Sequence, residues 1–546
     1  MVAFIRTVRT ASGATAVQIV AKVKGRNRVL EHVGSAHTEL DLALLQQAAR
    51  ERLDEVAPPL DLPVEVPVRP ARLLPGPAEG VLDWSSPAAL GERDGLVAPA
   101  RILATGSEVL YRAIGTVYEE LGFAAALEDP VFADLVIARV VEPTSLLDAG
   151  RVLIELGARP ASYATMKRTL ARVTGRDYRA TVASACFARA TSHGDLTLVL
   201  FDVTTLYFEA EHEDELRKVG YSKERRVDPQ VVVGLLVDRT GFPLELTCWA
   251  GNKAETATLL PTIRAFQERH GLADFFVVAD AGMLSSSNLK ALDEAGMRFI
   301  VGSRQAKAPA DLASHFRWHG DALVDGQLID TITPRHAGTT SENDVAKKVE
   351  PVWDPAMHPK SWRAVWAYSA KRAARDGRTL TLQENRAKAV VAGERAARTP
   401  RFVTVHKGDA VLDENALARA RRLVGLKGYV SNIPHTLMPA AEVIASYHDL
   451  WHVEASFRMS KTDLRARPMF HHNRDAIEAH LTIVMTALAL AREIQSRTGI
   501  TIRQVNRQLR PLRSATIRIN GATHRIPPEI PEPQQAILNA LQKPGH

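Results

Sequence analysis

The sequence predicts an α/β fold built around a sheet whose strands carry carboxylates, and three observations support this. Residues 196–209, LTLVLFDVTTLYFE, begin as an apolar run and become rich in β-branched and aromatic residues, which indicates a buried strand containing Asp202. Residues 275–283, FFVVADAGM, indicate a shorter strand that ends at Asp280 before a glycine turn. Between 191 and 305 the pattern runs as three strands, a helix, a strand, a helix and a strand. The carboxyl end of a strand is where α/β folds place chemistry.

An ionised carboxylate inside a buried strand is costly, so Asp202 needs a partner that compensates its charge. The residues alone leave two explanations open, a hydrogen-bonded structural aspartate and a metal ligand.

A third carboxylate is predicted on a helix at 447–461, YHDLWHVEASFRMSK. Tyr447, Glu454 and Lys461 are spaced seven residues apart, and at about 3.6 residues per turn this spacing puts them on one helix face. Arg458 lies one turn after the glutamate. Two aspartates on strands and one glutamate on a helix can therefore converge.

Residues 1–57 predict a small β-rich domain, because alternating segments are separated by turn residues and followed by a helix near 39–55. The prolines of 58–98 predict an extended linker. Residues 99–190 predict a helical region that contains a helix-turn-helix-like segment. Its part 151–190 holds eight Lys or Arg against two acidic residues, a net +6, which fits either a solvated helix face or a DNA-binding surface.

The 174 residues from Asp280 to Glu454 exceed what a plain α/β core needs, so 306–434 is expected to be an insertion. Its expected strands are 327–335, 362–370, 378–386 and 401–408. Residues 346–407 carry fourteen Lys or Arg and five acidic residues, a net +9, which makes the insertion the strongest electrostatic candidate for DNA contact.

The composition agrees with a nucleic-acid partner. The chain has 546 residues and a net charge of +7, and its pI is about 9.3, so several domains and an anionic partner are expected. Two cysteines provide neither a disulfide framework nor a cysteine zinc motif, which favours a reducing cytoplasm. The longest apolar helical run, near 481–491, is too short to span a bilayer, and the first residues lack the apolar core of a signal peptide. A cytoplasmic protein without a membrane partner is expected.

These features together resemble the DDE transposases of bacterial insertion sequences, in the cut-and-paste group with a β-rich insertion before the catalytic Glu. The resemblance rests on Asp202, Asp280 and Glu454, and on the helix signature Tyr-x2-Arg-x3-Glu-x6-Lys. In this chain Leu450 replaces the arginine of the signature, and Arg458 is the candidate for a similar charge.

The resemblance implies a ribonuclease H-like catalytic core formed by 191–305 and 435–498, with 306–434 as an inserted mixed, β-rich domain and 499–546 as a basic C-terminal tail. It also implies an aromatic residue in the insertion that stacks on an unpaired base. The candidates are Trp353, Trp362 and Trp366, for which core packing is the alternative role.

The implied activity is that of a DNA transposase, which cleaves the ends of an insertion sequence and joins the freed 3′-OH to target DNA. Two Mg²⁺ ions are the implied cofactors, with Mn²⁺ as an alternative, because hard cations prefer carboxylate oxygens. The implied metal ligands are Asp202 as the bridge and Asp280 and Glu454 as the flanks, and the implied DNA-binding residues are Tyr447, Arg458 and Lys461. The implied partners are element-end and target DNA and further copies of the chain, in a homodimer or a higher synaptic complex.

Two alternatives remain open. One is a ribonuclease H-like nuclease that hydrolyses DNA without joining it, and the amino-terminal basic region and the basic insertion favour the transposase over it. The other is a catalytically degenerate DNA-binding derivative, which the complete set of three carboxylates disfavours and the Leu450 replacement favours.

Overall fold

The computed structural model describes residues 3–9, 15–23, 26–36 and 100–542, apart from short gaps in the last range. These gaps are 193, 195, 210–211, 221–227, 273–274, 284, 337–341, 396–400, 407–408, 472 and 521. The chain divides into two compact units, Met1–Gly95 and Leu96–His546.

The described part of the first unit is a three-stranded antiparallel sheet. Its strands are β1 (Ala3–Arg9), β2 (Thr15–Val23) and β3 (Arg26–Ala36), in the order β1-β2-β3. Val17, Ile19, Val20 and Ala21 of the central strand β2 are buried, and Gln18 is half-buried. The predicted amino-terminal sheet is therefore confirmed. The predicted helix near 39–55 and the predicted linker at 58–98 lie outside the described residues.

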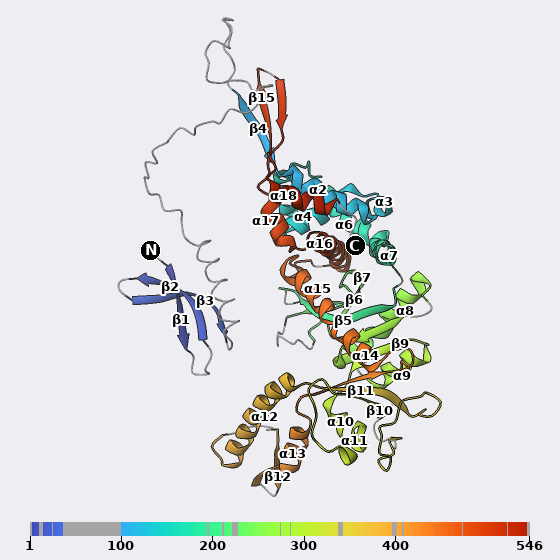
Figure 1. Cartoon of the computed structure of the whole chain (residues 1–546). Coiled ribbons are helices and arrows are strands. Elements are labelled where there is room, and N and C mark those ends of the chain that lie inside the picture. Colours follow the sequence, from blue (N-terminus) through green and yellow to red (C-terminus); the bar gives the residue numbers. More distant parts are fainter. Residues whose placement is uncertain are drawn as a thin grey trace, which may run out of the picture. The chain divides into compact units, whose positions relative to one another are not determined.

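The second unit contains a central sheet with the topology of a ribonuclease H-like core (Figure 1). Five of its strands are β5 (Leu198–Tyr207), β6 (Gln230–Asp238), β7 (Pro243–Ala250), β8 (Phe276–Ala279) and β9 (Arg298–Gly302). They lie in the order β7-β6-β5-β8-β9, where β6 and β7 are antiparallel to their neighbours and β8 and β9 run parallel to β5. The predicted order of strands and helices is confirmed.

Short local signals produce this order. The β6–β7 hairpin turns at Gly241, whose φ of +87° favours glycine, and the Asp238 carboxylate accepts hydrogen bonds from the amides of Thr240 and Phe242. Helix α8 (Leu259–His270) connects β7 to β8, and α9 (Ser286–Glu294), capped by Ser285, connects β8 to β9.

The two faces of the sheet pack against different layers. On β5, Val199, Phe201 and Val203 pack in one core cluster with residues of α8 and α9. Leu198, Leu200 and Leu206 point the other way, into a cluster that includes α15 (Trp451–Thr462) and α16 (Arg474–Thr498). Because side chains alternate along a strand, this parity decides which side of the sheet any functional residue faces.

The insertion extends the same sheet instead of forming a separate one. Strands β10 (Leu328–Pro334), β11 (Ser361–Tyr368) and β14 (Leu426–Ser431) continue it antiparallel from β9, so that the described strands give an eight-stranded order β10-β11-β14-β9-β8-β5-β6-β7. Its other elements are η4 (Gln305–Lys307), α10 (Ala308–Asp311), α11 (Ala313–Trp318), α12 (Ala370–Val391), β12 (Val403–His406), β13 (Asp409–Leu412) and α13 (Glu414–Arg422). The inserted mixed domain is confirmed.

One predicted strand of the insertion is wrong. Residues 378–386 lie in the middle of α12, which has 22 residues. The alternation of Thr and Leu there suggested a strand, but the flanking segments are rich in Ala, Arg and Lys, which favour helix. Leu380 and Ala387, two helical turns apart, supply the buried stripe.

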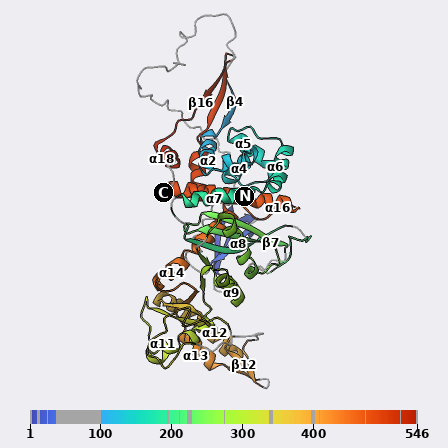
Figure 2. The same ribbon diagram turned by 90° about the vertical axis from the view of Figure 1, so that its right-hand side faces the viewer.

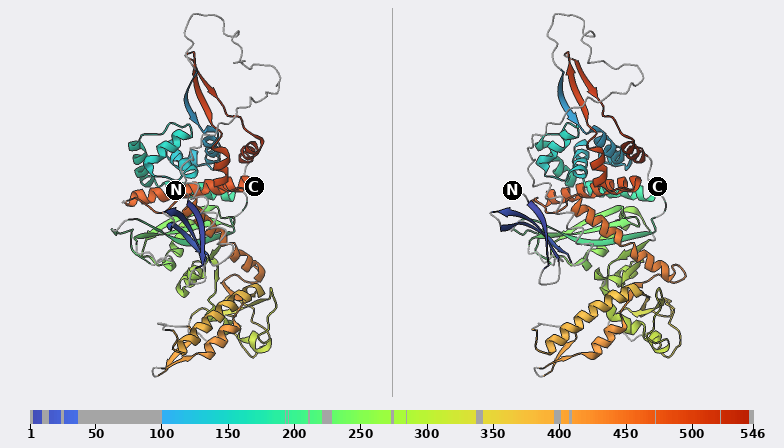
Figure 3. Two further views of the ribbon diagram at one scale, coloured as in Figure 1. Left: turned by 90° about the vertical axis from the view of Figure 1, so that its left-hand side faces the viewer. Right: turned by 60° about the vertical axis from the view of Figure 1, so that its left-hand side comes forward.

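A layer of helices covers the face of the sheet that bears Leu200. Its elements are α2 (Glu108–Glu120), α3 (Phe123–Leu127), α4 (Pro130–Val141), α5 (Leu146–Glu155), α6 (Tyr163–Gly175) and α7 (Tyr178–Thr191). Helix α16 lies between this layer and the sheet and contacts α2, α4, α6 and β7 (Figures 2 and 3). That position explains why α16 is buried on nearly every side. Although α16 has 25 residues, neither it nor another helix in the described part of the chain is apolar enough over a sufficient length to cross a membrane.

The C-terminal residues fold onto the helical layer, so the description of 499–546 as a tail needs correction. They form α17 (Ile502–Leu509), β15 (Ser514–Ile519), β16 (Ala522–Ile526) and α18 (Glu532–Leu541). Strand β15 pairs with β4 (Arg101–Gly106), and α18 packs on α2 and α16 (Figure 2). Sequence patterns within the tail did not show this, because the partner strand lies about four hundred residues earlier in the chain.

Candidate active site

Asp202 and Asp280 occupy matching positions on adjacent parallel strands. Phe201 of β5 is the register partner of Ala279 of β8. Asp202 follows Phe201 within β5, and Asp280 follows Ala279, the last residue of β8. Neighbouring strands are about 4.8 Å apart. Side chains two residues apart lie on the same face of a strand, so Asp202 is on the face of Leu200 and Asp280 is on the face of Val278. Both carboxylates are therefore on the side of the sheet that faces α15. Asp202 is half-buried and Asp280 is exposed.

Two hydrogen bonds join these strands to two consecutive helices, the second of which carries Glu454. The Tyr447 hydroxyl, on α14 (Ala440–His448), donates to Asp280 Oδ1 at 2.9 Å. The Lys461 ammonium, near the end of α15, donates to the Thr204 hydroxyl, two residues beyond Asp202. Glu454 is exposed on α15 between these two points, and α15 packs against β5 and β6. The fold thus brings the helix that carries Glu454 onto the carboxylate-bearing strands.

The single continuous helix expected for 447–461 is interrupted. Helix α14 ends at His448, α15 begins at Trp451, and the amide of Leu450 bonds to the carbonyl of Tyr447, three residues back. Such tight bonds are typical of a short 3₁₀ turn between helices. The turn allows α14 to pack on β8 and β9 while α15 crosses β5.

The arginine position of the helix signature lies in the hydrophobic core. Leu450 is 6% exposed and belongs to the core cluster of α15 and α16. Arg458 is exposed and lines a cleft of about 830 Å³ together with Trp451 and Arg492. That cleft includes none of the three carboxylates. Arg458 therefore lies one turn from Glu454 but opens toward a neighbouring surface.

Lys427 of β14 is a cation at the site that the sequence analysis missed. Its ammonium is 4.5 Å from the ring centroid of Tyr447. Burial lowers the pKa of Lys427, Arg372 of α12 lowers it further, and the charges of Asp280 and Glu454 oppose this. One ammonium therefore senses both carboxylates. No local pattern marks Lys427, since only the pairing of β14 with β9 brings it to this edge.

Two glycines shape the surroundings of Asp280. A Cβ on Gly302, at the end of β9, would lie 2.7 Å from the Tyr447 hydroxyl oxygen, so the absence of a side chain gives the tyrosine its place. A Cβ on Gly282 would have Asp280 Oδ2 at 3.9 Å and Glu255 Oε2 at 3.6 Å. Glu255, in the 3₁₀ turn Glu255–Ala257, is thus a further carboxylate close to Asp280 that the sequence analysis did not select.

Burial and the Asp280 charge act strongly on Tyr447. Burial raises the pKa of its phenol, and the adjacent negative charge of Asp280 and the hydrogen bond to it raise the pKa further. Tyr447 therefore stays a neutral hydrogen-bond donor at physiological pH, which suits a group that holds a carboxylate in place.

The donor set of the three acids fits hard divalent cations. Within the described part of the chain, His315, His319 and Glu350 form the group of three possible metal ligands whose donor atoms all lie within 4.8 Å of one another. The donor atoms of Asp202, Asp280 and Glu454 are therefore farther apart than this. A two-metal site does not require so close a group, because the ions are about 4 Å apart and the flanking carboxylates bind different ions.

Half of the positive charge counted in 151–190 is neutralised by ion pairs within the fold. The paired residues are Arg151 with Glu142, Asp148 and Glu155, Arg172 with Asp129, Arg179 with Glu478, and Arg189 with Glu493. The two helices of the expected helix-turn-helix-like segment are present as α5 and α6. The exposed basic residues of 151–190 are Arg159, Lys167, Arg168 and Arg176, apart from the paired Arg151.

The insertion presents exposed basic residues on several elements, and the longest of these elements is α12. Its exposed cations are Lys371, Arg375, Arg378, Arg386 and Lys388. Arg363, also counted in that charge, is 1% exposed and binds Asp330 inside the domain. The tryptophans proposed for base stacking or packing, Trp353, Trp362 and Trp366, are at most 3% exposed. They pack in the core, which leaves no ring face for a base.

Comparison with known proteins identifies a family and finds similar solved structures. The family described as Transposase DDE domain matches residues 193–490. Comparison with curated proteins finds no match. Among solved structures, the piggyBac transposase in a synaptic complex with hairpin DNA is similar over 80% of this chain and 71% of its own, at 9% identity and a TM-score of 0.33.

Proposed function

The chain belongs to the Transposase DDE domain family, and on that premise we propose that it cleaves DNA at the ends of a mobile element and joins them to target DNA. The observation that carries the proposal is the placement of three carboxylates. Asp202 and Asp280 are in register on adjacent parallel strands. Lys461 ties the helix of Glu454 to the strand of Asp202, and Tyr447, on the preceding helix, binds Asp280.

Asp202 would bridge two divalent cations, and Asp280 and Glu454 would each hold one of them. Mg²⁺ is the proposed ion, because the donors are carboxylate oxygens, and Mn²⁺ is the alternative. Such a pair of ions supplies an activated oxygen nucleophile and a stabilised leaving oxygen.

The protein's own groups would position the reactants. Tyr447 fixes one oxygen of Asp280 and would leave the other to bind a cation. Lys461 and Lys427 would place positive charge beside the scissile phosphate, and Arg458 would hold the strand farther out. Cations near a transferring phosphoryl group stabilise the charge that develops in the transition state.

Cleavage and joining would use the same site in turn. Water first attacks a phosphorus at the element end, the P–O3′ bond breaks, and the 3′-oxygen leaves as a hydroxyl. That hydroxyl then attacks a target phosphorus and displaces its 3′-oxygen. Each step forms one P–O bond and breaks one, so that the joining step needs no external energy source.

The strongest alternative is a degenerate DNA-binding derivative, and one observation favours it. Leu450 is buried, so the position of the signature arginine supplies no charge to the site. Lys427 and Arg372 approach from the insertion and offer a replacement for that charge.

A strand-transfer assay tests the proposal. The substrate is duplex DNA that carries the ends flanking the coding sequence, with supercoiled plasmid as the target and Mg²⁺ or EDTA in parallel. We expect Mg²⁺-dependent nicking and joined products from the natural chain and neither from Asp202→Asn. Nicking without joining would favour the nuclease, and DNA binding without nicking would favour the degenerate derivative.

A further inference from the structure

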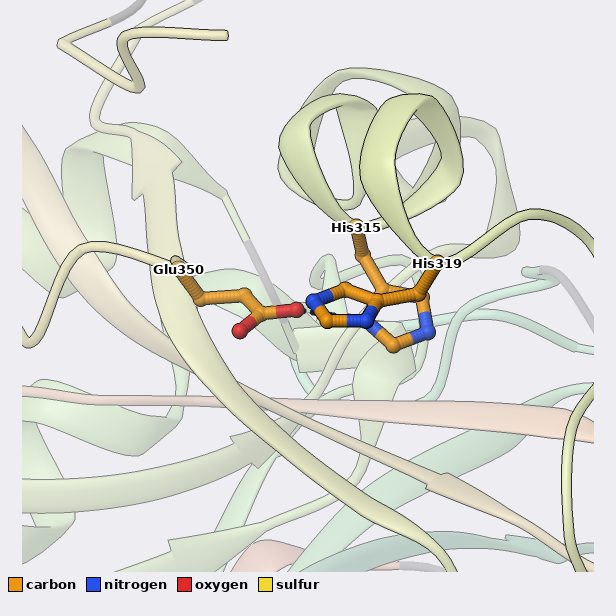
Figure 4. Close-up of side chains that lie close together, drawn as sticks. All are labelled: His315, His319 and Glu350. Atoms are coloured by element: carbon orange, nitrogen blue, oxygen red, sulfur yellow. Dashed lines mark hydrogen bonds and ion pairs between the residues drawn. The ribbon is translucent and has the colours of Figure 1, made fainter. Parts of the chain in front are cut away.

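A second group of possible metal ligands lies in the insertion, away from the three acids. His315 and His319 are one helical turn apart at α11, and Glu350 comes from the segment 342–360 between β10 and β11 (Figure 4). One donor atom of each residue lies within 4.8 Å of those of the other two. Figure 4 shows the two imidazole rings overlapping and the carboxylate reaching toward them.

His315 is held in a defined orientation. It is 4% exposed, and its Nδ1 forms a 2.5 Å hydrogen bond with Glu350 Oε1. The ring of His319 lies against it, with centroids 4.9 Å apart and planes inclined by 30°. In the neutral tautomer whose Nδ1–H donates a hydrogen bond to the carboxylate, the other nitrogen, Nε2, carries the free lone pair.

An ion pair between His315 and Glu350 does not explain the second ring nitrogen, Nε2 of His315. Nε2 of His315 is buried and has no hydrogen-bond partner among the described residues. Buried polar atoms are normally satisfied, so an orphaned one calls for a missing partner. A histidine that gives one N–H to a carboxylate and directs the other nitrogen to an ion is the usual arrangement in metal sites.

We propose that His315, His319 and Glu350 form a binding site for a transition-metal ion of the Zn²⁺ class. Imidazole nitrogens suit Zn²⁺, Ni²⁺ or Cu²⁺, whereas Mg²⁺ prefers oxygen ligands, so the site is chemically distinct from the three acids. The two histidines supply the nitrogen ligands, and Glu350 orients His315 and neutralises charge.

The role of this ion is structural. The described part of 342–360 contains neither a helix nor a strand, and its links to the rest of the insertion include the bond from Trp318 Nε1 to the carbonyl of Val345. An ion held by the two histidines would fix the ring of His315, and through its bond to Glu350 would fasten this segment to the helix. Metal ligation that joins distant segments stabilises the folded state, because the unfolded chain offers no such site.

The test uses untagged full-length protein, dialysed against a chelator and then titrated with ZnCl₂ in the presence of excess Mg²⁺. Bound zinc is measured by mass spectrometry after gel filtration, and thermal stability is measured on the same samples. We expect one equivalent of zinc and a higher melting temperature in the natural chain, and an affinity at least about tenfold lower in His319→Ala and Glu350→Gln.

Two controls make the outcome decisive. His336→Ala removes an exposed histidine of the same insertion and should keep the zinc. Asp202→Asn should also keep it, so that failure of the proposed catalytic site and failure of this site are distinguishable. Because His319 is exposed, its replacement should leave the fold intact. Equal zinc binding by the natural chain and His319→Ala, or no binding by either, would overturn the proposal in favour of a simple His–Glu ion pair.

Discussion

Gly302→Ala tests whether the contact between Tyr447 and Asp280 positions a proposed metal ligand. The new Cβ would lie 2.7 Å from the Tyr447 hydroxyl oxygen, 3.2 Å from its Cζ and 3.1 Å from the Cβ of Ala281. The shortest of these contacts is with the hydroxyl, which now donates to Asp280 Oδ1 at 2.9 Å. Alanine should therefore push the hydroxyl away from Asp280.

The size of the effect follows from two terms. Overpacking a filled site costs about 1–3 kcal/mol. Loss of a hydrogen bond to a charged group costs about 1.5–3 kcal/mol, but Asp280 is exposed, so water replaces the phenol and the lower end applies. In a Tyr447→Phe background the 2.7 Å contact no longer exists. Gly302→Ala should then cost less, with a coupling between the two changes of about 1–2 kcal/mol.

The assay compares melting temperature and Mg²⁺-dependent nicking in the natural chain, both single variants and the double variant. Each kcal/mol corresponds to about 2–4 °C for a domain of this kind. Both single variants should lose stability and nicking, and the double variant should be more stable than the sum predicts. Gly377→Ala is the control, because a Cβ there meets nothing within 4 Å and alanine favours helix. Strict additivity, or a Gly302→Ala protein with normal stability and nicking, would refute the reasoning.

Three further outcomes are expected. Glu454→Gln should lower cleavage and joining by about 10²–10⁴-fold, since metal ligation is worth several kcal/mol. Its DNA binding and melting temperature should stay close to those of the control Glu442→Gln. An active Glu454→Gln enzyme would remove Glu454 from the proposed set of metal ligands. Arg378 and Arg386 are both exposed on α12. Replacing either with alanine should weaken binding to end DNA and reduce the slope of log affinity against log salt concentration by about 1. Unchanged slopes in titrations from low to high salt would exclude α12 from the DNA interface. Burial raises the pKa of Glu245 to about 7, although the charge of Arg269 lowers it. Between about pH 4.5 and 7 the folded state therefore keeps a proton that the unfolded state has lost. The contribution of Glu245 to stability falls as the pH rises through this range. Glu245→Gln should flatten that part of the melting-temperature profile, and an unchanged profile would contradict the assignment.

Several features were predictable because local patterns specify them. The strand around Asp202 follows from an apolar, β-branched run, and the strand before Asp280 from a short run that ends at a glycine turn. Their order along the chain followed from the pattern, and the resemblance to a known family implied the ribonuclease H-like core. The strand expected at 378–386 was wrong, because a short alternating stretch cannot be told from part of a long helix without its packing partners.

The sequence by itself indicated three candidate acids, the order of the core elements and the presence of a basic insertion, because these depend on residue type and short-range periodicity. Only the tertiary structure decided what stands beside the acids. Lys427 and Glu255 come near Asp280 through strand pairing and a turn at other points of the chain, and β15 pairs with β4 across about four hundred residues. It also decided which charges remain available, since ion pairs such as that of Arg179 with Glu478 join segments far apart in sequence. Contacts of this kind are set by how the layers pack, and no local pattern encodes them.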